Sequence, residues 1–534
     1  MAKLNNTPAI TKFIFKREWI IALIWFIILI PLTTIVALAF ENLYGNPLEM
    51  AGMAETMQNP AMVAMVGPIF DINNYHMGAM MGQMMLLFTI LAVAAMNIFL
   101  VIRHTRKDEE AGRIEVIRSL PVGKHSTLLS TMIVCIIINA AFSILTTLGL
   151  ALSNVDTIDF AGSLLYGASL GISGLFFGAV AALFAQLSST SRGALSYSFI
   201  FMGIAYLVRA VGDVSINILS YISPLGLVLR TQVYVSNYWW PLLIILGETL
   251  IVIGLAFYLN SYRDLGAGII AAKPGRKEAK NSLLSPLGLT LRLLKNTLIG
   301  WGITITILGA TYGSIFGDIE KFVEGSEMLK QMFLYEGATH TFAEQFMTTI
   351  LILYSIMITI PIIIILFKVR TEEKKGRLEH LYAKKISRTQ VLFNYFIITI
   401  VSSIIFIALY SIGLWWAALM VMTEPIALST VITGAMVYLP AIWLIIGFGM
   451  LLIAYAPKWT SIIWGYLGFA FFVVYLGKLL KMPAWLESVA IYGNIPKMPV
   501  EEFKIMPLII LTILAVIMFV ISFYGYQKRD LIQQ

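Results

Sequence analysis

Long apolar segments constrain this chain most, because each approaches the roughly 20 residues that a helix needs to span a bilayer. The composition agrees with that reading, since 59% of the 534 residues are hydrophobic and only 12% are charged. We therefore predict an all-α polytopic membrane protein with twelve transmembrane helices. The predicted spans lie near residues 19–40, 79–102, 127–152, 160–187, 192–212, 239–261, 297–317, 345–369, 390–422, 427–456, 459–480 and 505–526.

The basic residues indicate how the chain crosses the membrane. With both termini in the cytoplasm, the cytoplasmic segments hold 29 of the 37 Lys and Arg residues, and the first external loop, 41–78, holds none. The positive-inside rule favours this orientation. Because the basic residues flank apolar segments and form neither a groove nor a tail, we expect membrane lipid and not nucleic acid as the partner.

Two short motifs occur twice at similar spacing. EEAGRIEVI from Glu109 matches EKKGRLEHL from Glu373, 264 residues later, and FYLNSYRDL from Phe257 matches FYGYQKRDL from Phe523. A tandem duplication explains both matches. We predict two pseudo-symmetric six-helix halves, 1–261 and 285–534, joined by a cytoplasmic linker, 262–284.

Each half carries further matching features outside its spans. Thr7-Pro8 and Ser285-Pro286 each predict the capped start of an N-terminal amphipathic surface helix, before spans 1 and 7. Between spans 5 and 6 of each half, an apolar stretch is interrupted, after Val214 in one half and after Met482 in the other. We expect these two stretches to form short helices in the outer leaflet.

The stretch RKDEEAGRIEVIRSLPVGK, 106–124, carries nine charged side chains in nineteen residues. It predicts a mixed-charge cytoplasmic helix over 107–119, between spans 2 and 3. A solvated loop is the simpler alternative, but positive-inside topology does not require the acids, and the same acid-Gly-Arg-aliphatic-Glu order returns after span 8. Such a helix suits docking to a protein surface.

These motifs resemble the permeases of bacterial type-2 ABC exporters, in particular the twelve-span, tetronasin-resistance-like permeases of polyketide and polyether antibiotic export. EEAGRIEVIRSLPVGK, 109–124, is similar to that family's first inner loop, and NPAMVAMVGPIFD, 59–71, to its first external loop. The resemblance implies a bacterial cell membrane protein with a coupling helix between spans 2 and 3 of each half. The ATPase-coupling residues it implies are Asp108, Glu109, Glu110, Gly112, Arg113, Glu115 and Arg118, and by the repeat Glu372, Glu373, Gly376, Arg377 and Glu379.

The chain lacks a nucleotide site of its own. It contains no G-x-x-x-x-G-K-[ST] phosphate loop and no arrangement of nucleophile and base, so we predict a transport permease and not an enzyme. ATP and Mg would be held by a separate ABC-class ATPase, in two copies because one chain contains both halves. A single cysteine, Cys135, and five scattered histidines favour neither a disulfide framework nor a metal centre.

Several residues are candidates for the substrate path. Glu248 lies about ten residues into span 6, where a carboxylate is costly and is either functional or a protonated, hydrogen-bonded group. Arg209 and Lys478, at the outer ends of spans 5 and 11, either attract an anionic substrate or snorkel to the surface. Met80, Met81 and Met84 belong to a methionine-rich segment that suits hydrophobic substrates of variable shape, with ordinary packing as the simpler explanation.

The prediction that joins these features is a permease subunit of an ATP-driven ABC exporter that extrudes hydrophobic or amphipathic compounds, such as antibiotics. Two alternatives remain open. A proton-coupled secondary drug transporter also has twelve spans, although its usual loop motif differs from the one at Asp108. A permease-like sensor that binds an antibiotic or lipid without exporting it is the other.

Overall fold

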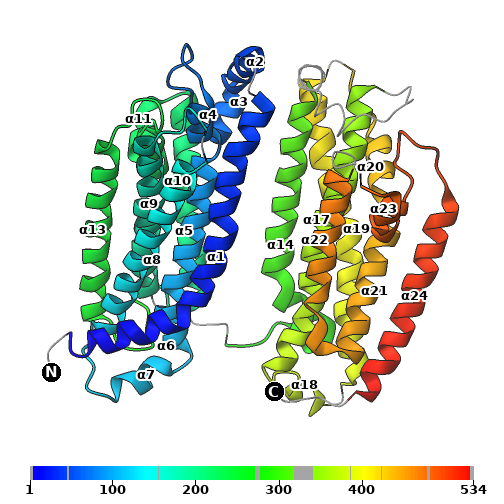
Figure 1. Ribbon diagram of the computed structural model, residues 1–534. Coiled ribbons are helices and arrows are strands. Elements are labelled where there is room, and N and C mark those ends of the chain that lie inside the picture. The colour runs from blue at the N-terminus through cyan, green and yellow to red at the C-terminus, as the bar shows by residue number, and fades with distance from the viewer. Residues whose placement is uncertain are drawn as a thin grey trace. The chain divides into compact units, whose positions relative to one another are not determined.

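The computed structural model describes residues 4–44, 47–153, 155–270, 277–317, 341–384, 386–422, 424–477 and 482–529. The chain divides into two compact units, Met1–Gly275 (unit 1) and Arg276–Gln534 (unit 2). Both units are bundles of helices, and the described ranges contain no strand (Figure 1). The all-α prediction is confirmed for this part of the chain.

Unit 1 contains short helices at both ends of its long ones. Its elements are α1 (Thr7–Tyr44), α2 (Pro47–Met57), α3 (Pro60–Val66), α4 (Met77–Met84), α5 (Leu86–Ile102), the π-helical turn η1 (Arg103–Lys107), α6 (Asp108–Glu110), α7 (Arg113–Arg118), α8 (Ser126–Ala151), α9 (Phe160–Leu187), α10 (Ser191–Val214), α11 (Asn217–Ile222), α12 (Pro224–Leu229) and α13 (Trp240–Tyr262).

Unit 2 has a similar order of long and short helices. Its elements are η2 (Asn281–Leu284), α14 (Pro286–Gly313), η3 (Ser314–Gly317), α17 (Phe342–Lys374), α18 (Glu379–Tyr382), α19 (Arg388–Val421), α20 (Leu428–Met436), α21 (Leu439–Tyr455), η4 (Pro457–Trp459), α22 (Ile462–Leu476), α23 (Ala484–Val489), η5 (Ile491–Asn494) and α24 (Ile505–Lys528).

Among the described residues, 11 helices are long and apolar enough to cross a membrane. Each of them overlaps one of the twelve predicted spans. The remaining predicted span, 459–480, coincides with α22, which has 15 residues. That length is short of a full crossing, so the twelfth span stays a prediction.

The packing pairs follow the same chain order in the two units. In unit 1, α1 packs on α8, and the central α9 contacts α5, α8 and α13. In unit 2, α14 packs on α19, α17 contacts α19 and α21, and α21 packs on α24. Burial follows these pairs, because 72% of the apolar window of α9 is buried but only 22% of that of α13. The outer helices therefore leave most of their apolar side chains exposed at the surface of their unit.

Small residues allow the inner helices of unit 1 to approach closely. A Cβ at Gly171 of α9 would clash with the Ser143 hydroxyl of α8. Nearby, Asn97 of α5 and Asn139 of α8 form a reciprocal amide pair, with hydrogen bonds of 3.0 and 2.6 Å. Tight helix contacts and satisfied polar pairs of this kind stabilise helix association where lipid offers no hydrophobic drive.

The predicted surface helices are not separate elements. α1 is one helix from Thr7 to Tyr44, although its first turns lie across the end of the bundle before the rest rises along it (Figure 1). The cap expected at Ser285 is confirmed, since its hydroxyl accepts from the Gly288 N–H at 3.0 Å. Thr7 instead donates its hydroxyl to the Leu4 carbonyl.

Candidate functional site

The charged stretch after α5 is broken into pieces, so the single helix predicted over 107–119 is wrong. η1 and α6 extend α5, and the chain then turns at Gly112 before α7. Gly112 has a φ of +72°, which a residue with a Cβ adopts only at a cost. Nothing lies within 4 Å of the Cβ position, so the backbone angle and not space requires glycine there. Gly376, before α18, has a φ of +66° and equally open surroundings.

Asp108 is buried at the centre of an ion-pair cluster. Arg17 of α1 donates to its two oxygens at 2.7 and 3.2 Å, and Arg113 donates to Oδ1 at 2.6 Å. The His104 ring lies between two carboxylates, with Nδ1 3.7 Å from Asp108 and Nε2 2.7 Å from Glu18. Arg103 completes the cluster by donating to both oxygens of Glu18. These contacts fix the start of α1 to the turn that carries α7.

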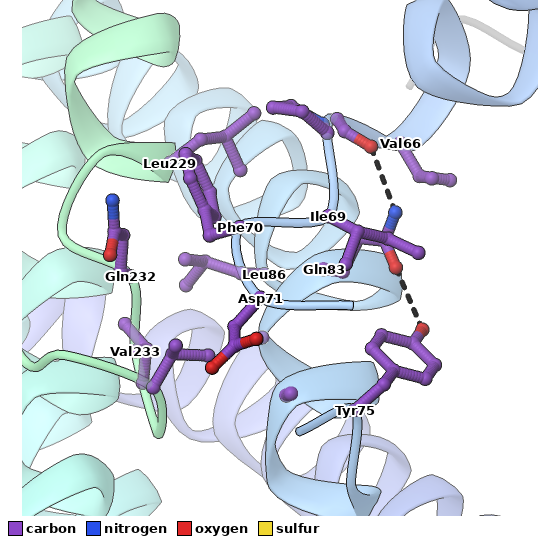
Figure 2. Close-up of a pocket in the computed structure, with 15 residues that line it drawn as sticks. Val66, Ile69, Phe70, Asp71, Tyr75, Gln83, Leu86, Leu229, Gln232 and Val233 are labelled. Atoms are coloured by element: carbon purple, nitrogen blue, oxygen red, sulfur yellow. Dashed lines mark hydrogen bonds between the residues drawn. The ribbon is translucent and has the colours of Figure 1, made fainter. Parts of the chain in front are cut away.

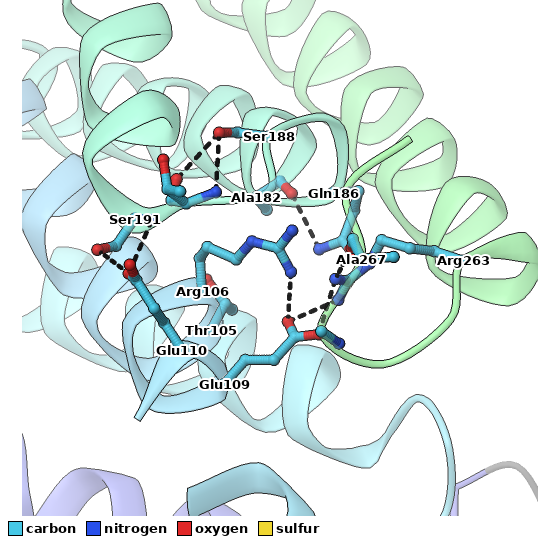
Figure 3. A network of polar contacts seen from close by, with 12 residues as sticks. Thr105, Arg106, Glu109, Glu110, Ala182, Gln186, Ser188, Ser191, Arg263 and Ala267 are labelled. Carbon is cyan, nitrogen blue, oxygen red and sulfur yellow. Dashed lines mark hydrogen bonds and ion pairs between the residues drawn. The ribbon is translucent and has the colours of Figure 1, made fainter. Parts of the chain in front are cut away.

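Glu109 forms a second buried cluster (Figure 3). Both nitrogens Nη1 and Nη2 of Arg263, just after α13, donate to it at 2.8 Å, and the Gly266 N–H donates at 2.6 Å. Arg106 lies 3.0 Å from the same carboxylate and is itself 1% exposed. The bidentate geometry makes Arg263 a directional tie between α6 and the end of α13.

Glu110 connects the same turn to α10. Its Oε2 accepts from both the backbone N–H and the hydroxyl of Ser191, at 3.1 and 2.5 Å (Figure 3). Ser191 is the first residue of α10, so the carboxylate also complements the positive end of that helix dipole. Three consecutive acids thus attach one turn to three different long helices.

Unit 2 repeats the core of this arrangement. Glu372 pairs with Lys368 at 3.0 Å and, across the glycine turn, with Arg377 at 3.1 Å. Glu373 pairs with Arg370 at 3.2 Å and with Arg529 after α24. These pairs match Asp108 with Arg113, and Glu109 with Arg106 and Arg263, in unit 1.

The two motifs that recur in the sequence meet in space within each unit. Glu109 belongs to the EEAGR motif and Arg263 to the motif 154 residues later, while Glu373 and Arg529 are separated by 156 residues. The sequence contains both repeats, but neither motif alone indicates that the two form an ion pair. Their common spacing was the available signal. Arg17 and Glu18 are not repeated in the second half. Pro8 and Pro286 are 278 residues apart, and at that spacing the residues that correspond to Arg17 and Glu18 are Lys295 and Asn296.

The predicted coupling residues therefore fall into two groups. Asp108, Glu109 and Glu372 are buried, and Glu110 and Glu373 are engaged within their own units. The Arg113 and Arg377 side chains are each 57% exposed, and Glu115 and Glu379 are also exposed. Val116 at 68% adds an exposed apolar side chain on α7. This second group presents a surface that a partner could contact, together with Glu110, which is exposed although it accepts hydrogen bonds from Ser191.

Arg118 occupies an intermediate position. Its Nη2 donates to the Lys124 carbonyl at 3.3 Å, and burial lowers the pKa of its guanidinium. The residue therefore closes α7 onto the following turn more than it offers charge to a partner.

Arg209 lies in a different environment from the one predicted. It is fully buried, so the expected snorkelling to the surface does not occur. Its guanidinium donates to the carbonyls of Val63, Ala64 and Met65 at the end of α3, and pairs with Asp213 at 3.4 Å. A cation at a helix C-terminus satisfies carbonyls that lack intrahelical partners. Arg209 thus holds the end of α3 onto α10.

The other substrate-path candidates are scattered. Glu248 is half-buried on α13, and its Oε2 has no hydrogen-bond partner among the described residues. Met80 and Met81 are fully buried in α4, and Met84 is half-buried. Lys478 lies outside the described residues. No cavity described here brings Glu248, Arg209 and the three methionines together.

The pocket between the loop after α3 and the start of α4 is small. Gln83 of α4 bridges it, donating to the Gly67 carbonyl at 2.9 Å and accepting from the Tyr75 hydroxyl at 2.7 Å (Figure 2). Its volume of about 20 Å³ has room for a single water. This region is a closely packed contact between the loop and α4, and it is too small to bind a drug.

An apolar groove of about 720 Å³ lies between α14 and α19 in unit 2. Its lining is aliphatic and aromatic apart from Thr306, Ser402 and Gly302. Its volume falls within the range of ligand pockets.

Comparison with known proteins identifies the family. The chain is 30% identical, over 530 residues, to the multidrug efflux system permease protein Rv1217c of Mycobacterium tuberculosis strain ATCC 25618 / H37Rv, covering 98% of this chain and 95% of that one. The chain belongs to the multidrug efflux permease family. A family model described as the C-terminal domain of multidrug efflux system permease Rv1217c matches residues 283–527, all of which lie in unit 2. The prediction of a multi-pass efflux permease is therefore confirmed.

Proposed function

We propose that this permease is the membrane subunit of an ATP-driven ABC exporter. The observation that carries the proposal is the matched pair of short helices α7 and α18. Each follows a turn with a left-handed glycine and has an exposed arginine and an exposed glutamate at or next to its first turn. The turn before each helix is tied to its unit by an equivalent buried ion pair, Glu109–Arg263 in unit 1 and Glu373–Arg529 in unit 2. An exposed helix that is anchored to the long helices by buried ion pairs can transmit a displacement from a bound partner to those helices.

The anchors of α7 provide a route for that force. Arg17 links the turn to α1, Ser191 links it to α10, and Arg263 links it to the end of α13. Closure of an ATPase against α7 would displace these three helices together and bias the permease between inward and outward access. In unit 2, Arg529 offers the corresponding link to α24.

The proposal includes the full topology. The two units would be six-span halves, 1–261 and 285–534, with 262–284 as linker and α22 contributing to the twelfth span. Both termini would be cytoplasmic in a bacterial cell membrane, as the distribution of basic residues supports. The interrupted elements α11, α12 and α23 would lie in the outer leaflet. Two copies of a separate ABC-class ATPase, holding ATP and Mg, would dock on α7 and α18.

The substrates would be hydrophobic or amphipathic compounds, including polyketide and polyether antibiotics. The relative's description as a multidrug efflux permease and the apolar groove between α14 and α19 support this class.

Inverted membrane vesicles test the proposal. They would contain the permease together with the ABC-class ATPase encoded nearest to it, and a fluorescent hydrophobic drug would be added to the surrounding medium. We expect ATP-dependent drug uptake that stops when the ATPase loses its catalytic glutamate. Uptake that persists unchanged with that inactive ATPase would rule the proposal out.

Proton-coupled transport is the second candidate, and Glu248 is the observation that favours it. A half-buried carboxyl in a long apolar helix, with one oxygen lacking a hydrogen-bond partner among the described residues, is a possible proton carrier. Proteoliposomes with the permease alone and an imposed pH gradient distinguish the two. Gradient-driven flux that Glu248→Gln abolishes would replace the ATP-driven proposal.

A further inference from the structure

Unit 1 contains a polar pocket of about 490 Å³ at the end of the bundle opposite α7. Three segments form it: the loop at Pro68 and Phe70, the stretch from the end of α10 into α11, and the turn after α12. The pocket lies wholly within unit 1. Its volume would hold a phosphate or carboxylate headgroup with several attached atoms.

The charges around this pocket do not balance. Asp213 is the acid shared by two buried arginines, at 3.4 Å from Arg209 and 3.7 Å from Arg230, and it also accepts from Ser220 at 2.6 Å. Arg209 lies away from the pocket lining and donates from Nη1 and Nη2 to the carbonyls of α3. One positive charge therefore remains, and it belongs to Arg230, which lines the pocket.

Arg230 is held in place by its neighbours, but not all of its N–H donors have a hydrogen-bond partner among the described residues. Its side chain is 9% exposed, its Nη2 donates to Asn217 at 2.5 Å, and its guanidinium lies over the Tyr221 ring at 4.7 Å. Its Nε has no hydrogen-bond partner among the described residues. A buried guanidinium with spare donors is costly, and an oxyanion is the ligand whose geometry its planar fork matches.

Backbone strain gathers in the turn that follows Arg230. Gln232, Tyr234 and Asn237 all have φ between +48° and +64°, although none is glycine. Such residues cost free energy and persist where the surrounding structure holds them, which is common beside binding sites. Gln232 lines the pocket, so this strained turn forms part of its wall.

Exposed apolar residues adjoin the pocket. Ile218 and Ile222 of α11 are 66% and 63% exposed, on either side of the pocket residue Tyr221. Tyr221 stacks on Trp240, the first residue of α13, with ring centroids 6.5 Å apart. Exposed Tyr and Trp together with isoleucines are typical of the membrane interface, where one end of a ligand is apolar and the other hydrated.

We infer that this pocket binds an amphipathic anion, with its phosphate or carboxylate on Arg230 and its apolar part along the exposed isoleucines of α11. The ligand is either an anionic lipid of the outer leaflet or an acidic amphiphile released by the permease. Both present a singly charged oxyanion above an apolar chain. The site needs no ATPase, so it stands apart from the proposed mechanism of energy coupling.

Native mass spectrometry of the purified full chain in a neutral detergent tests this inference, with phosphatidylglycerol and oleate as separate probes and phosphatidylcholine as the zwitterionic reference. Arg230→Gln removes the charge. Ser215→Trp fills the pocket from an exposed position and leaves the ion pairs intact. Lys504→Gln, which removes an exposed charge before α24, is the matched control.

We expect phosphatidylglycerol, oleate or both to bind wild type and the control equally, with the apparent Kd raised about tenfold or more by Arg230→Gln and by Ser215→Trp. Loss of phosphatidylglycerol binding alone identifies a lipid site, and loss of oleate binding alone identifies a site for an acidic amphiphile. If Arg230→Gln fails to fold, Ser215→Trp decides the question. The inference is overturned if Ser215→Trp leaves the apparent Kd for both anions unchanged. It is also overturned if wild type binds the anions no more tightly than it binds phosphatidylcholine.

Discussion

The ion pair between Glu109 and Arg263 offers a quantitative test of how the charged turn holds α13. Glu109→Gln keeps the size of the side chain but removes its charge, which leaves Arg263 and Arg106 buried at 7% and 1% exposure without their counter-ion. The Gly266 N–H keeps an acceptor in glutamine. Removing one partner of a buried ion pair costs about 3–5 kcal/mol, and we expect the lower end of that range here.

The assay is reversible unfolding by SDS in mixed micelles, followed by circular dichroism, for a double-mutant cycle. Glu109→Gln, Arg263→Gln and the double variant should give a coupling energy of about 1–3 kcal/mol, because the two residues share two hydrogen bonds of 2.8 Å. Glu115→Gln, at an exposed position on α7, should change the free energy of unfolding by less than about 0.5 kcal/mol. Additive single effects, or equal effects of Glu109→Gln and Glu115→Gln, would refute the reasoning.

Three further predictions use the same unfolding assay. Gly112→Ala should cost about 1–2 kcal/mol because of its φ of +72°, and Gly112→Asn should cost less, since asparagine tolerates that region; equal costs would contradict the conformational argument. Arg209→Met should destabilise by about 3–5 kcal/mol, because it removes the nearer of the two arginines that pair with Asp213 and leaves the α3 carbonyls without their buried donor. Arg209→Lys should restore only part of that stability, whereas a neutral Arg209→Met would show that the arginine is dispensable. Asn97→Leu should cost about 1–2 kcal/mol by removing the donor to the Asn139 Oδ1, although the Asn139 Nδ2 keeps its bond to the Cys135 carbonyl, and a stabilising effect would show that the amide pair is not a net attraction.

The elements could be predicted from sequence wherever hydropathy alone decides them. Each of the 11 helices that meet the length and hydropathy needed for crossing overlaps a predicted span. α22 is different, because its helix stops at Leu476 although the apolar pattern continues. The break at Gly112 was missed since the charge periodicity on both sides is compatible with one helix, and only the left-handed backbone angle reveals the turn.

The site was predictable in position but not in geometry. Charge density marked the stretch around Glu109, but which acids face the bundle depends on partners more than 90 residues away, such as Arg17 and Arg263. Hydropathy places Arg209 near the end of a span, yet it cannot tell a lipid-facing position from one that caps α3. The internal repeat could have predicted part of this geometry. In each unit, one repeated motif supplies the glutamate and the other supplies the arginine of the same ion pair, Glu109–Arg263 and Glu373–Arg529.

The proposal that α7 and α18 receive force from an ATPase is tested most directly by charge reversal at their exposed acids. The double variant Glu115→Lys with Glu379→Lys would be expressed with the ATPase, and ATP hydrolysis and drug export would be measured in the same inverted vesicles. We expect normal membrane insertion and continuing ATP hydrolysis, with ATP-dependent export reduced at least about tenfold, the loss expected for a contact worth 1.4 kcal/mol. Export equal to that of wild type, in vesicles that contain equal amounts of both subunits, would contradict the account.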